Sequence, residues 1–548
     1  MTAAPAAAEP GGVGRASALL ASGTIVSRFL GFLSALVLAQ TLGTQGAGAN
    51  SFALATQIPN AIYAIVAGGL LSAVLVPQIV RAGLHDDGGE KFINRVVTLG
   101  IVLFVGIAAI ATACAPLIVP LFVQQGERGL SGGTVTLAIA LAYWSLPQIL
   151  FYALYSLLGE VLNARGMFGP FTWAPVVNNV VAVAGYFVFG ALFGSRNLQD
   201  AAAWTPDMIA LLAGSATLGI ASQAAILTAF WKKAGLHYHP EFRWRGVGLG
   251  RVGRVAGWTF AMIVVSQLAG LIQSKVATMA GNDAASVAVL RYAWLIFILP
   301  HSVVTLSIAT AYFTRMSGHA RDNDIGSLRA DISASLRTIG LAIVFSAVAL
   351  IVLAYPFAAV FSKHGFGETQ AMGNVLIAFL LGLIPFSILS VLQRTFYALE
   401  DTRTPFFIQL VQAGLFVAGA LVVATLPQES IAVGLAIAIS AAGTMQTLIT
   451  AAVLRRRLGG IDGRRIIRQL TVFLLACLPA AAAGTGLVSV LGAYTGGYAV
   501  SGILPAVLTM LVAGSLMLVI YLGVLALLRN GELRAVAGPI TARLRGRR

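Results

Sequence analysis

The sequence predicts an all-α integral membrane protein with about 14 transmembrane helices, and three observations lead to this fold class. Of the 548 residues, 58% are hydrophobic and only 10% are charged, and the mean hydropathy is +0.88. Apolar runs long enough to cross a hydrocarbon core of roughly 30 Å recur from one end of the chain to the other. A soluble protein of this length could not cover so much apolar surface with so few charges.

The apolar runs predict the individual spans in order. Proline residues inside several of them, among them Pro59, Pro147, Pro175, Pro300 and Pro385, are expected to kink the helices. The predicted spans are residues 17–42, 50–80, 93–122, 133–163, 170–194, 207–231, 254–280, 286–315, 338–362, 370–399, 404–426, 431–454, 469–492 and 503–528.

The basic residues indicate the orientation of these spans, because cytoplasmic loops carry an excess of Lys and Arg. With the N-terminus in the cytoplasm, 29 of the 35 Lys and Arg residues fall in inner segments or at the inner ends of spans, and three fall in outer loops. The remaining three, Arg28, Lys275 and Arg291, lie within spans. This asymmetry predicts that both termini are cytoplasmic. It also accounts for the net charge of +16 by topology, so no nucleic-acid partner is expected.

Three ordered matches indicate an internal duplication at a separation of about 240 residues. The stretch SRFLGF from Ser27 matches SQLAGL from Ser266, and Pro59 in IPNAI matches Pro300 in LPHSV. The junction SLLGEVLNARGMFGPF likewise matches SVLQRTFYALEDTRTPF. A six-span repeat gives two copies with the same orientation, an architecture found in transporters with a substrate site between the halves. A duplicated scaffold that transports nothing is the alternative.

The duplication divides the chain into two six-helix lobes followed by two further helices. The predicted segments are a disordered cytoplasmic tail (1–16), an N-lobe (17–233), a basic cytoplasmic linker (234–253), a C-lobe (254–458), the last two spans (459–528) and a basic cytoplasmic tail (529–548).

Arg28 lies in mid-bilayer, about eleven residues or roughly 16 Å from the inner end of the first span. A charge there costs roughly 3 kcal/mol on insertion scales. Helical spacing places the small residues Ser27, Gly31, Ser34 and Ala35 on its side of the helix, as expected for the wall of a water-filled cavity. The alternative is an arginine bound to helix carbonyls or to a neighbouring polar side chain.

Lys275 and Arg291 lie about five residues from the outer ends of the seventh and eighth spans, so each could instead reach the membrane interface. Further polar residues could line the same cavity. They could equally form hydrogen bonds between helices, or in one case (Asn50) cap a helix. These candidates are Ser27, Asn50, Gln57, Asn60 and Gln267.

The chemistry of the spans favours an anionic, amphiphilic substrate. No acidic residue occupies the middle of any span, although a proton-coupled exporter or a cation carrier normally needs a buried carboxylate. The sequence contains no phosphate-binding loop, no metal-spaced His/Cys cluster and no Ser–His–Asp set. We therefore expect a transporter rather than an enzyme, without a cofactor and without a metal site.

Several stretches together resemble the MurJ/MviN family of lipid II flippases, which belongs to the multidrug/oligosaccharidyl-lipid/polysaccharide exporter superfamily. They are SRFLGF, QIPNAIYAIVAGGLLSAVLVPQIVR in the second span, YAWLIFILP in the eighth and TRTPF in the eleventh. The resemblance covers essentially the whole chain and implies fourteen spans in two lobes plus two helices. It also implies that the protein moves undecaprenyl-pyrophosphate-linked lipid II from the inner to the outer leaflet by alternating access.

The resemblance extends only in part to the family's functional residues. Arg28 matches the functional arginine of the first span, whereas the second arginine there is replaced near Leu33 and Ser34. The arginine pair of the second span falls at Tyr63 and Ala64, and the arginine of the eighth span at Leu295. The aspartate of the second span falls at Asn50, and no sodium site is evident in spans 7 and 11. Arg291 lies one turn before Leu295, and Lys275 could supply charge that is lost elsewhere. Membrane potential is therefore the simpler driving force.

Four functions remain open from the sequence. The first is a lipid II flippase of the bacterial cytoplasmic membrane, working as a monomer, with cell-division or wall-synthesis proteins as candidate partners. The second is a flippase for another polyprenyl-linked glycan of capsule, teichoic or O-antigen type. The third is a drug/cation antiporter of the same superfamily, which the missing carboxylates disfavour. The fourth is a membrane scaffold that recruits partners through its basic loops.

Overall fold

The computed structural model describes residues 10–70, 89–126, 128–242, 249–536 and 538. These residues form helices and contain no β-strand, apart from one isolated bridge between Gln125 and Leu130. The chain divides into two compact units. Unit 1 comprises Met1–Leu42 and Gly46–Gln267, and unit 2 comprises Gly43–Gln45 and Leu268–Arg548. The segment boundaries expected from the sequence stay predictions.

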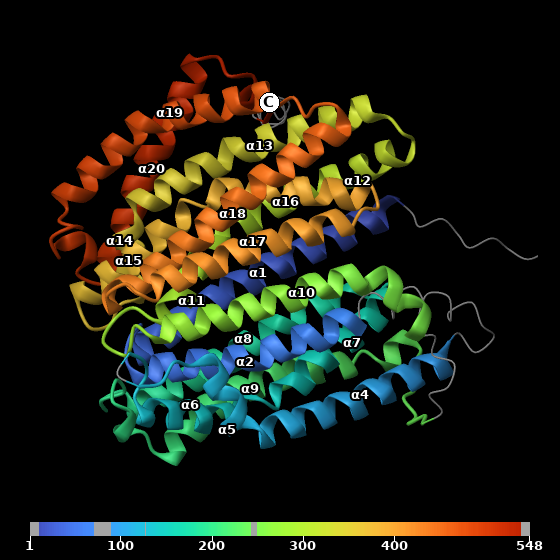
Figure 1. Cartoon of the computed structure of the whole chain (residues 1–548), viewed down its shortest axis with the longest axis vertical. Helices are drawn as coiled ribbons and strands as arrows, with labels where there is room; N and C mark the ends of the chain where they lie inside the picture. The colour runs from blue at the N-terminus through green and yellow to red at the C-terminus, as the bar shows by residue number, and fades with distance from the viewer. Residues whose placement is uncertain (1–9, 71–88, 127, 243–248, 537, 539–548) are drawn as a thin grey trace, which may run out of the picture. The chain divides into compact units, whose positions relative to one another are not determined.

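Unit 1 is a bundle of long helices (Figure 1). Helix α8 packs against α1 and α9, α2 packs against α6 and α7, and α4 packs against α7. Gly185 allows the closest of these approaches, since a Cβ atom there would lie 2.2 Å from Cβ of Ser215 on α9. The elements are α1 (Pro10–Leu42), α2 (Ala47–Leu70), α4 (Glu90–Ala113), α5 (Ala115–Ile118), η1 (Val119–Phe122), α6 (Gly132–Ser145), α7 (Gln148–Ala164), α8 (Phe168–Phe193), η2 (Ala201–Ala203), α9 (Pro206–Thr228), η3 (Lys232–Ala234) and the larger part of α10 (Leu249–Thr278).

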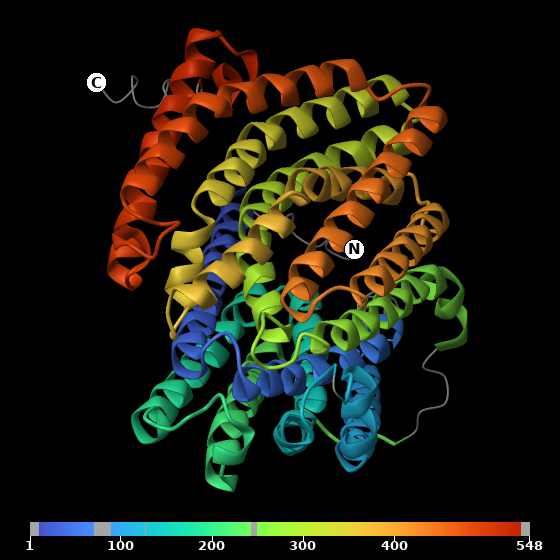
Figure 2. The same cartoon turned by 60° about the vertical axis from the view of Figure 1, so that its left-hand side comes forward.

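Unit 2 begins within α10 and continues to the C-terminus (Figure 2). Its elements are α11 (Val287–Pro300), η4 (His301–Thr305), α12 (Leu306–Arg321), α13 (Ile325–Val352), α14 (Ala354–Phe361), α15 (Phe366–Leu380), α16 (Leu383–Ala398), α17 (Arg403–Val423), α18 (Gln428–Leu458), α19 (Gly463–Val490), η5 (Tyr498–Val500) and α20 (Ile503–Leu527).

The same pattern of helix packing occurs in both units. In unit 1, α2 packs on α6, α4 on α7, and α8 on α9. In unit 2 the corresponding pairs are α11 on α15, α13 on α16, and α17 on α18. Each pair occupies the same place in the order of its unit, as a duplicated six-span segment requires.

The last two helices, α19 and α20, pack on α13 and α14 of unit 2. Their core includes Phe473 of α19 and Met517 of α20, both of which are fully buried. The hydroxyl of Tyr521 donates a hydrogen bond of 2.7 Å to the carbonyl oxygen of Leu341, and its ring lies 5.1 Å from that of Phe345. A buried tyrosine hydroxyl needs such a partner, so this contact fixes α20 on α13.

Twelve helices of the described residues are long and apolar enough to cross a membrane. The count becomes up to 13 if α15 and α16, which meet at an angle of 41°, form one broken span. Helix α2 corresponds to the remaining predicted span, 50–80, of which residues 71–80 lie outside the described part. The membrane-spanning all-α fold is confirmed, whereas the count of fourteen stays a prediction.

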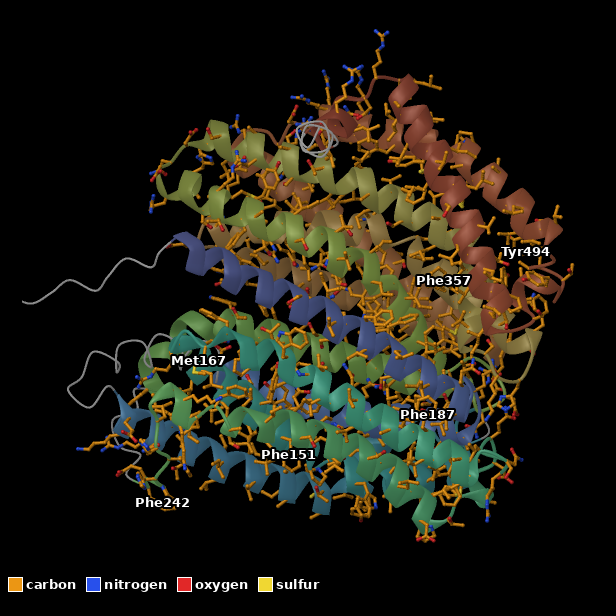
Figure 3. All side chains as sticks on the ribbon, turned by 180° about the vertical axis from the view of Figure 1, so that it is seen from behind. Phe151, Met167, Phe187, Phe242, Phe357 and Tyr494 are labelled. Atoms are coloured by element: carbon orange, nitrogen blue, oxygen red, sulfur yellow. The ribbon has the colours of Figure 1, made fainter. Side chains whose placement is uncertain are left out.

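The outer surfaces of the helices are apolar, as expected for helices surrounded by lipid tails. Phe187 of α8, labelled in Figure 3, is 63% exposed. Large exposed apolar side chains also recur along α20, at Leu504, Leu511, Val512 and Val519. A soluble protein rarely leaves apolar surface of this extent uncovered.

Breaks in the helices occur near three of the five expected prolines, whereas α2 and α8 continue through Pro59 and Pro175. Helix α6 ends two residues before Pro147, and the bend between α15 and α16 lies just before Pro385. Pro300 is followed directly by a π-helical turn, His301–Thr305. His301 is buried there, with its Nδ1 atom 3.2 Å from Oγ of Ser387. Such π-helical turns inside α-helices often accompany functional sites.

Candidate functional site

The surroundings of Arg28 on α1 are polar on one side and apolar on the other. The amide of Asn179 on α8 donates a hydrogen bond of 3.1 Å to the carbonyl oxygen of Ser27, and a Cβ atom on Gly31 would lie 3.7 Å from the same amide. Phe29, on a neighbouring face, is 67% exposed. Arg28 itself is half-buried, and none of the ion pairs among the described residues involves it.

Asn179 is a residue that the sequence analysis did not single out. Its neighbour in the sequence, Asn178, lies against Gly219 of α9. The signal was the pair of asparagines in the apolar stretch VVNNVVAV. One asparagine faces each neighbouring helix, so the pair joins α8 to both α1 and α9.

Helix α2 carries three of the predicted polar residues. Asn50 is fully buried in its first turn, and since α2 begins at Ala47, Asn50 does not cap the helix. Gln57 follows at a spacing of seven and is half-buried, whereas Asn60, one turn further, is exposed. The three therefore form a polar stripe along α2 that becomes more open toward Pro59.

Gln267 on α10 reaches α2 through its amide. The Nε2 atom donates a hydrogen bond of 3.0 Å to the carbonyl oxygen of Ala61. Tyr63, two residues further, places its ring 5.7 Å from that of Tyr152 on α7. The position at which the resemblance would place an arginine thus holds an aromatic ring packed against a neighbouring helix.

Lys275 and Arg291 lie close to the two ends of the α10–α11 connection in unit 2. Lys275 is exposed in the last turn of α10, and Arg291 is exposed four residues after the start of α11. Each is therefore only about 6 Å or less along its helix from the intervening loop. The hydroxyl of Ser286 donates a hydrogen bond of 2.9 Å to the carbonyl oxygen of Ala277, which holds the two helix ends together.

The structure therefore groups the predicted residues into two sets. Unit 1 holds Arg28 with Ser27, Asn50, Gln57, Asn60 and Gln267, and unit 2 holds Lys275 and Arg291. Among the described residues there is no group of three or more His, Cys, Asp or Glu side chains that could hold a metal ion. The chemistry available is that of guanidinium, ammonium, amide and hydroxyl groups, which bind oxyanions and sugars.

Comparison with known proteins gives consistent results. A family model described as "Lipid II flippase MurJ" matches residues 38–523. The chain is 26% identical over 482 residues to the "Probable lipid II flippase MurJ" of Haemophilus influenzae, covering 84% of this chain and 89% of that protein. It is also 26% identical over 405 residues to the protein of the same name from Rickettsia prowazekii, covering 72% and 75%.

Two solved structures resemble the chain over most of their length. One is titled "Lipid II flippase MurJ, inward closed conformation", with a TM-score of 0.68 and 20% identity, covering 91% of this chain and 98% of that one. The other is an inward-facing multidrug resistance MATE family transporter of the MOP superfamily, with a TM-score of 0.63 and 18% identity, covering 80% and 96%. The chain thus shares the fold of these multi-pass membrane transporters.

Proposed function

We propose that this chain, which belongs to the lipid II flippase MurJ family, moves the peptidoglycan precursor lipid II from the inner to the outer leaflet of the bacterial cytoplasmic membrane. The observation that carries the proposal is the family match across residues 38–523. The curated relatives that align over most of their length bear the name of this activity. The protein acts as a transporter for cell wall synthesis and not as an enzyme.

Arg28 is the cation that we assign to the pyrophosphate of the substrate. Guanidinium groups bind phosphate oxygens with two parallel hydrogen bonds, and a half-buried position strengthens the attraction. Lys275 and Arg291 are further cations that we assign to anionic groups of the substrate. Ser27, Asn50, Gln57, Asn60 and Gln267 supply amide and hydroxyl groups for the sugar and peptide parts of the headgroup, while the polyprenyl tail stays in lipid.

Membrane potential supplies the driving force in this proposal. An inside-negative potential favours outward movement of the negative headgroup by about 2.3 kcal/mol per charge per 100 mV. Both termini lie in the cytoplasm in this proposal, as the distribution of basic residues predicts. A single chain with two duplicated lobes is sufficient for alternating access, so the protein works as a monomer. Cell-division or wall-synthesis proteins are its candidate partners.

The test is complementation in a bacterium depleted of its own lipid II flippase, with lipid II exposure on the outer leaflet as the readout. We expect the wild type to restore exposure and growth. Arg28→Ala should lower the rate about tenfold or more, since a hydrogen bond to a charged group contributes about 1.5–3 kcal/mol. Arg28→Lys should retain part of the activity because it keeps the charge.

Arg196→Ala is the matched control, because Arg196 is an exposed arginine in a loop outside the spans. It should behave as the wild type when all variants are inserted equally. If the inserted wild type fails to restore lipid II exposure, the proposed substrate is wrong and another polyprenyl-linked glycan takes its place. If Arg28→Ala matches Arg196→Ala, the assignment of Arg28 to the substrate is wrong.

A further inference from the structure

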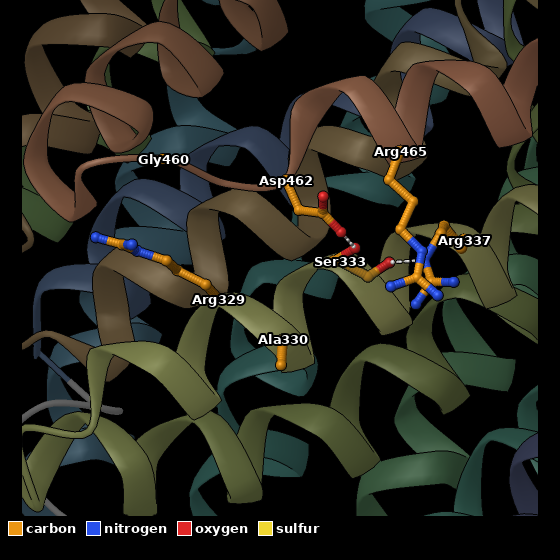
Figure 4. A pocket seen from close by; sticks show the side chains of 7 residues that line it. All are labelled: Arg329, Ala330, Ser333, Arg337, Gly460, Asp462 and Arg465. Carbon is orange, nitrogen blue, oxygen red and sulfur yellow. Dashed lines mark hydrogen bonds between the residues drawn. The ribbon is translucent and has the colours of Figure 1, made fainter.

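A pocket of about 390 Å³ lies in unit 2, away from the predicted cations of the spans. It is formed by one face of α13 and by the connection between α18 and α19 (Figure 4). The distribution of basic residues places these helix ends on the predicted cytoplasmic side. The lining residues are Arg329, Ala330, Ser333, Arg337, Gly460, Asp462 and Arg465.

Two arginines from different helices point toward one another in this pocket. Arg337 comes from α13 and Arg465 from the first turn of α19, and their guanidinium groups converge at one side (Figure 4). Arg337 is only 8% exposed; it pairs with Glu532, and its Nε atom donates a hydrogen bond of 3.1 Å to the carbonyl oxygen of Ser333. Arg465 is exposed, and its guanidinium has no ion pair or hydrogen bond among the described residues.

Arg329 extends toward the other side of the pocket. Its Nε atom is buried without a hydrogen-bond partner among the described residues. A Cβ atom on Gly459 would lie 2.7 Å from its guanidinium, so the glycine, with φ of 69°, allows the α18–α19 turn to close over the arginine. A buried donor without a partner costs free energy, and a bound oxyanion removes that cost.

The charge balance of the pocket selects the kind of anion. Three arginines and one carboxylate, Asp462, line the pocket, and Asp462 accepts a hydrogen bond of 2.6 Å from the hydroxyl of Ser333. Glu532, which does not line the pocket, pairs with Arg337 and balances its charge. One positive charge remains, which matches a phosphodiester, since a phosphodiester carries a single negative charge at neutral pH.

We propose that this arginine pocket binds the phosphodiester headgroup of an anionic phospholipid of the inner leaflet. Basic pockets between transmembrane helices on the cytoplasmic side are typical sites for such headgroups. The lipid adds a contact between α13 and the α18–α19 turn, and so holds α19 and α20 on the lobe. The site is separate from substrate transport, and its test does not depend on which glycolipid is moved.

The experiment uses the purified full-length protein in neutral detergent and measures its thermal unfolding midpoint during titration with phosphatidylglycerol. A ligand that binds the folded state raises the midpoint in proportion to RT ln(1 + [L]/Kd). Phosphatidylcholine is the uncharged lipid control. Inorganic phosphate, at the same concentrations, tests whether a free phosphate rather than a headgroup occupies the pocket.

Arg465→Ala is the diagnostic variant, and Arg464→Ala is its matched control. The two arginines are neighbours in the first turn of α19, both are exposed, and only Arg465 lines the pocket. Arg465→Ala should weaken phosphatidylglycerol binding about tenfold, the loss of one charge-assisted hydrogen bond. Arg464→Ala should leave the affinity within about twofold of the wild type.

Three outcomes decide the proposal. The proposal is supported if only phosphatidylglycerol shifts the unfolding midpoint, and if this shift is lost in Arg465→Ala and kept in Arg464→Ala. An equal shift with inorganic phosphate overturns the lipid headgroup as the ligand and leaves a site for free phosphate. Equal affinity of the two variants for phosphatidylglycerol overturns the pocket as the binding site, because the lipid then binds through the basic surface as a whole.

Discussion

Arg28 and Arg337 are both arginines in long helices, but the structure surrounds them differently. Arg337 on α13 is buried, pairs with Glu532 and donates to the backbone of its own helix. Arg28 on α1 is half-buried, lies beside Ser27 and Gly31, and belongs to none of the ion pairs of the described residues. Among the described residues, the charge of Arg337 is therefore balanced by an ion pair, and the charge of Arg28 is not.

This difference separates a structural arginine from one available for a ligand. A buried charge that lacks a partner is costly, so Arg337 is tolerated because Glu532 balances it. No ion pair among the residues that the structure describes offsets the cost of placing Arg28 within a span. An anionic substrate that binds beside Arg28 offsets this cost during transport. Breaking the pair of Arg337 and Glu532 should therefore lower mainly stability, whereas removing Arg28 should lower mainly transport.

The largest effect on stability is expected for Glu532→Ala, which leaves Arg337 buried and unpaired. Loss of one partner of a buried pair costs about 3–5 kcal/mol. The free energy of unfolding in detergent micelles should fall by that amount, and the C-terminal segment should become sensitive to protease. Arg534→Ala, two residues further and exposed, is the control and should change stability by less than about 0.5 kcal/mol.

A double variant checks that the loss comes from the unpaired charge. Replacing both partners by apolar residues, as in Arg337→Met with Glu532→Leu, should recover most of the stability, because no buried charge is then left unpaired. If the double variant is as unstable as Glu532→Ala, the side chain of Glu532 acts through packing, and the contrast with Arg28 does not hold.

Most of the fold was predictable because the bilayer restricts the choices. Each span must satisfy its backbone hydrogen bonds internally and must be long and apolar, so the predicted span 404–426 corresponds closely to α17, Arg403–Val423. The break at Pro300 was also predictable, since proline lacks the N–H donor that an α-helix needs. Its form, a π-helical turn with His301 against Ser387, depends on tertiary contacts.

The arginine pairing was not predictable, because Arg337 and Glu532 are separated by 195 residues. No local pattern indicates which carboxylate balances which arginine at such a separation. A weaker signal for the arginine pocket was present. Arg329, Ser333 and Arg337 recur at a spacing of four and so share one face of α13. The glycine-rich turn and Arg465, which complete the pocket, come from a distant segment.

A smaller effect is expected for the ion pair between Arg457, in the last turn of α18, and Asp401, in the α16–α17 connection. Burial raises the pKa of Asp401, but hydrogen bonds from Thr404 and the charge of Arg457 outweigh it and hold the pKa below its usual value. Arg457 is 43% exposed, so solvent screens the attraction, and Asp401→Asn should cost only about 0.2–1 kcal/mol.

The pH dependence of that cost has a definite sign. A carboxylate with a lowered pKa in the folded state contributes stability that is fully present above its unfolded pKa of about 3.9 and is lost as the pH falls through the folded pKa. The difference in unfolding free energy between wild type and Asp401→Asn should therefore be constant near neutral pH and disappear in acid. A constant difference that persists in acid would show that Asp401 acts through packing and not through its charge.

The smallest loss of stability is expected for Arg28→Leu, the variant that removes the mid-span charge. Since no ion pair among the described residues involves Arg28, its removal should lower the free energy of unfolding by less than about 0.5 kcal/mol, and the removal of a costly charge from the span favours the folded protein instead. Lipid II exposure in the complementation assay should nevertheless be lost. A fall of about 2 kcal/mol or more would place Arg28 with Arg337 as a structural arginine. If stability is kept and transport is lost, the charge of Arg28 acts on the substrate. Removal of a residue that only supports the fold would lower transport only together with stability.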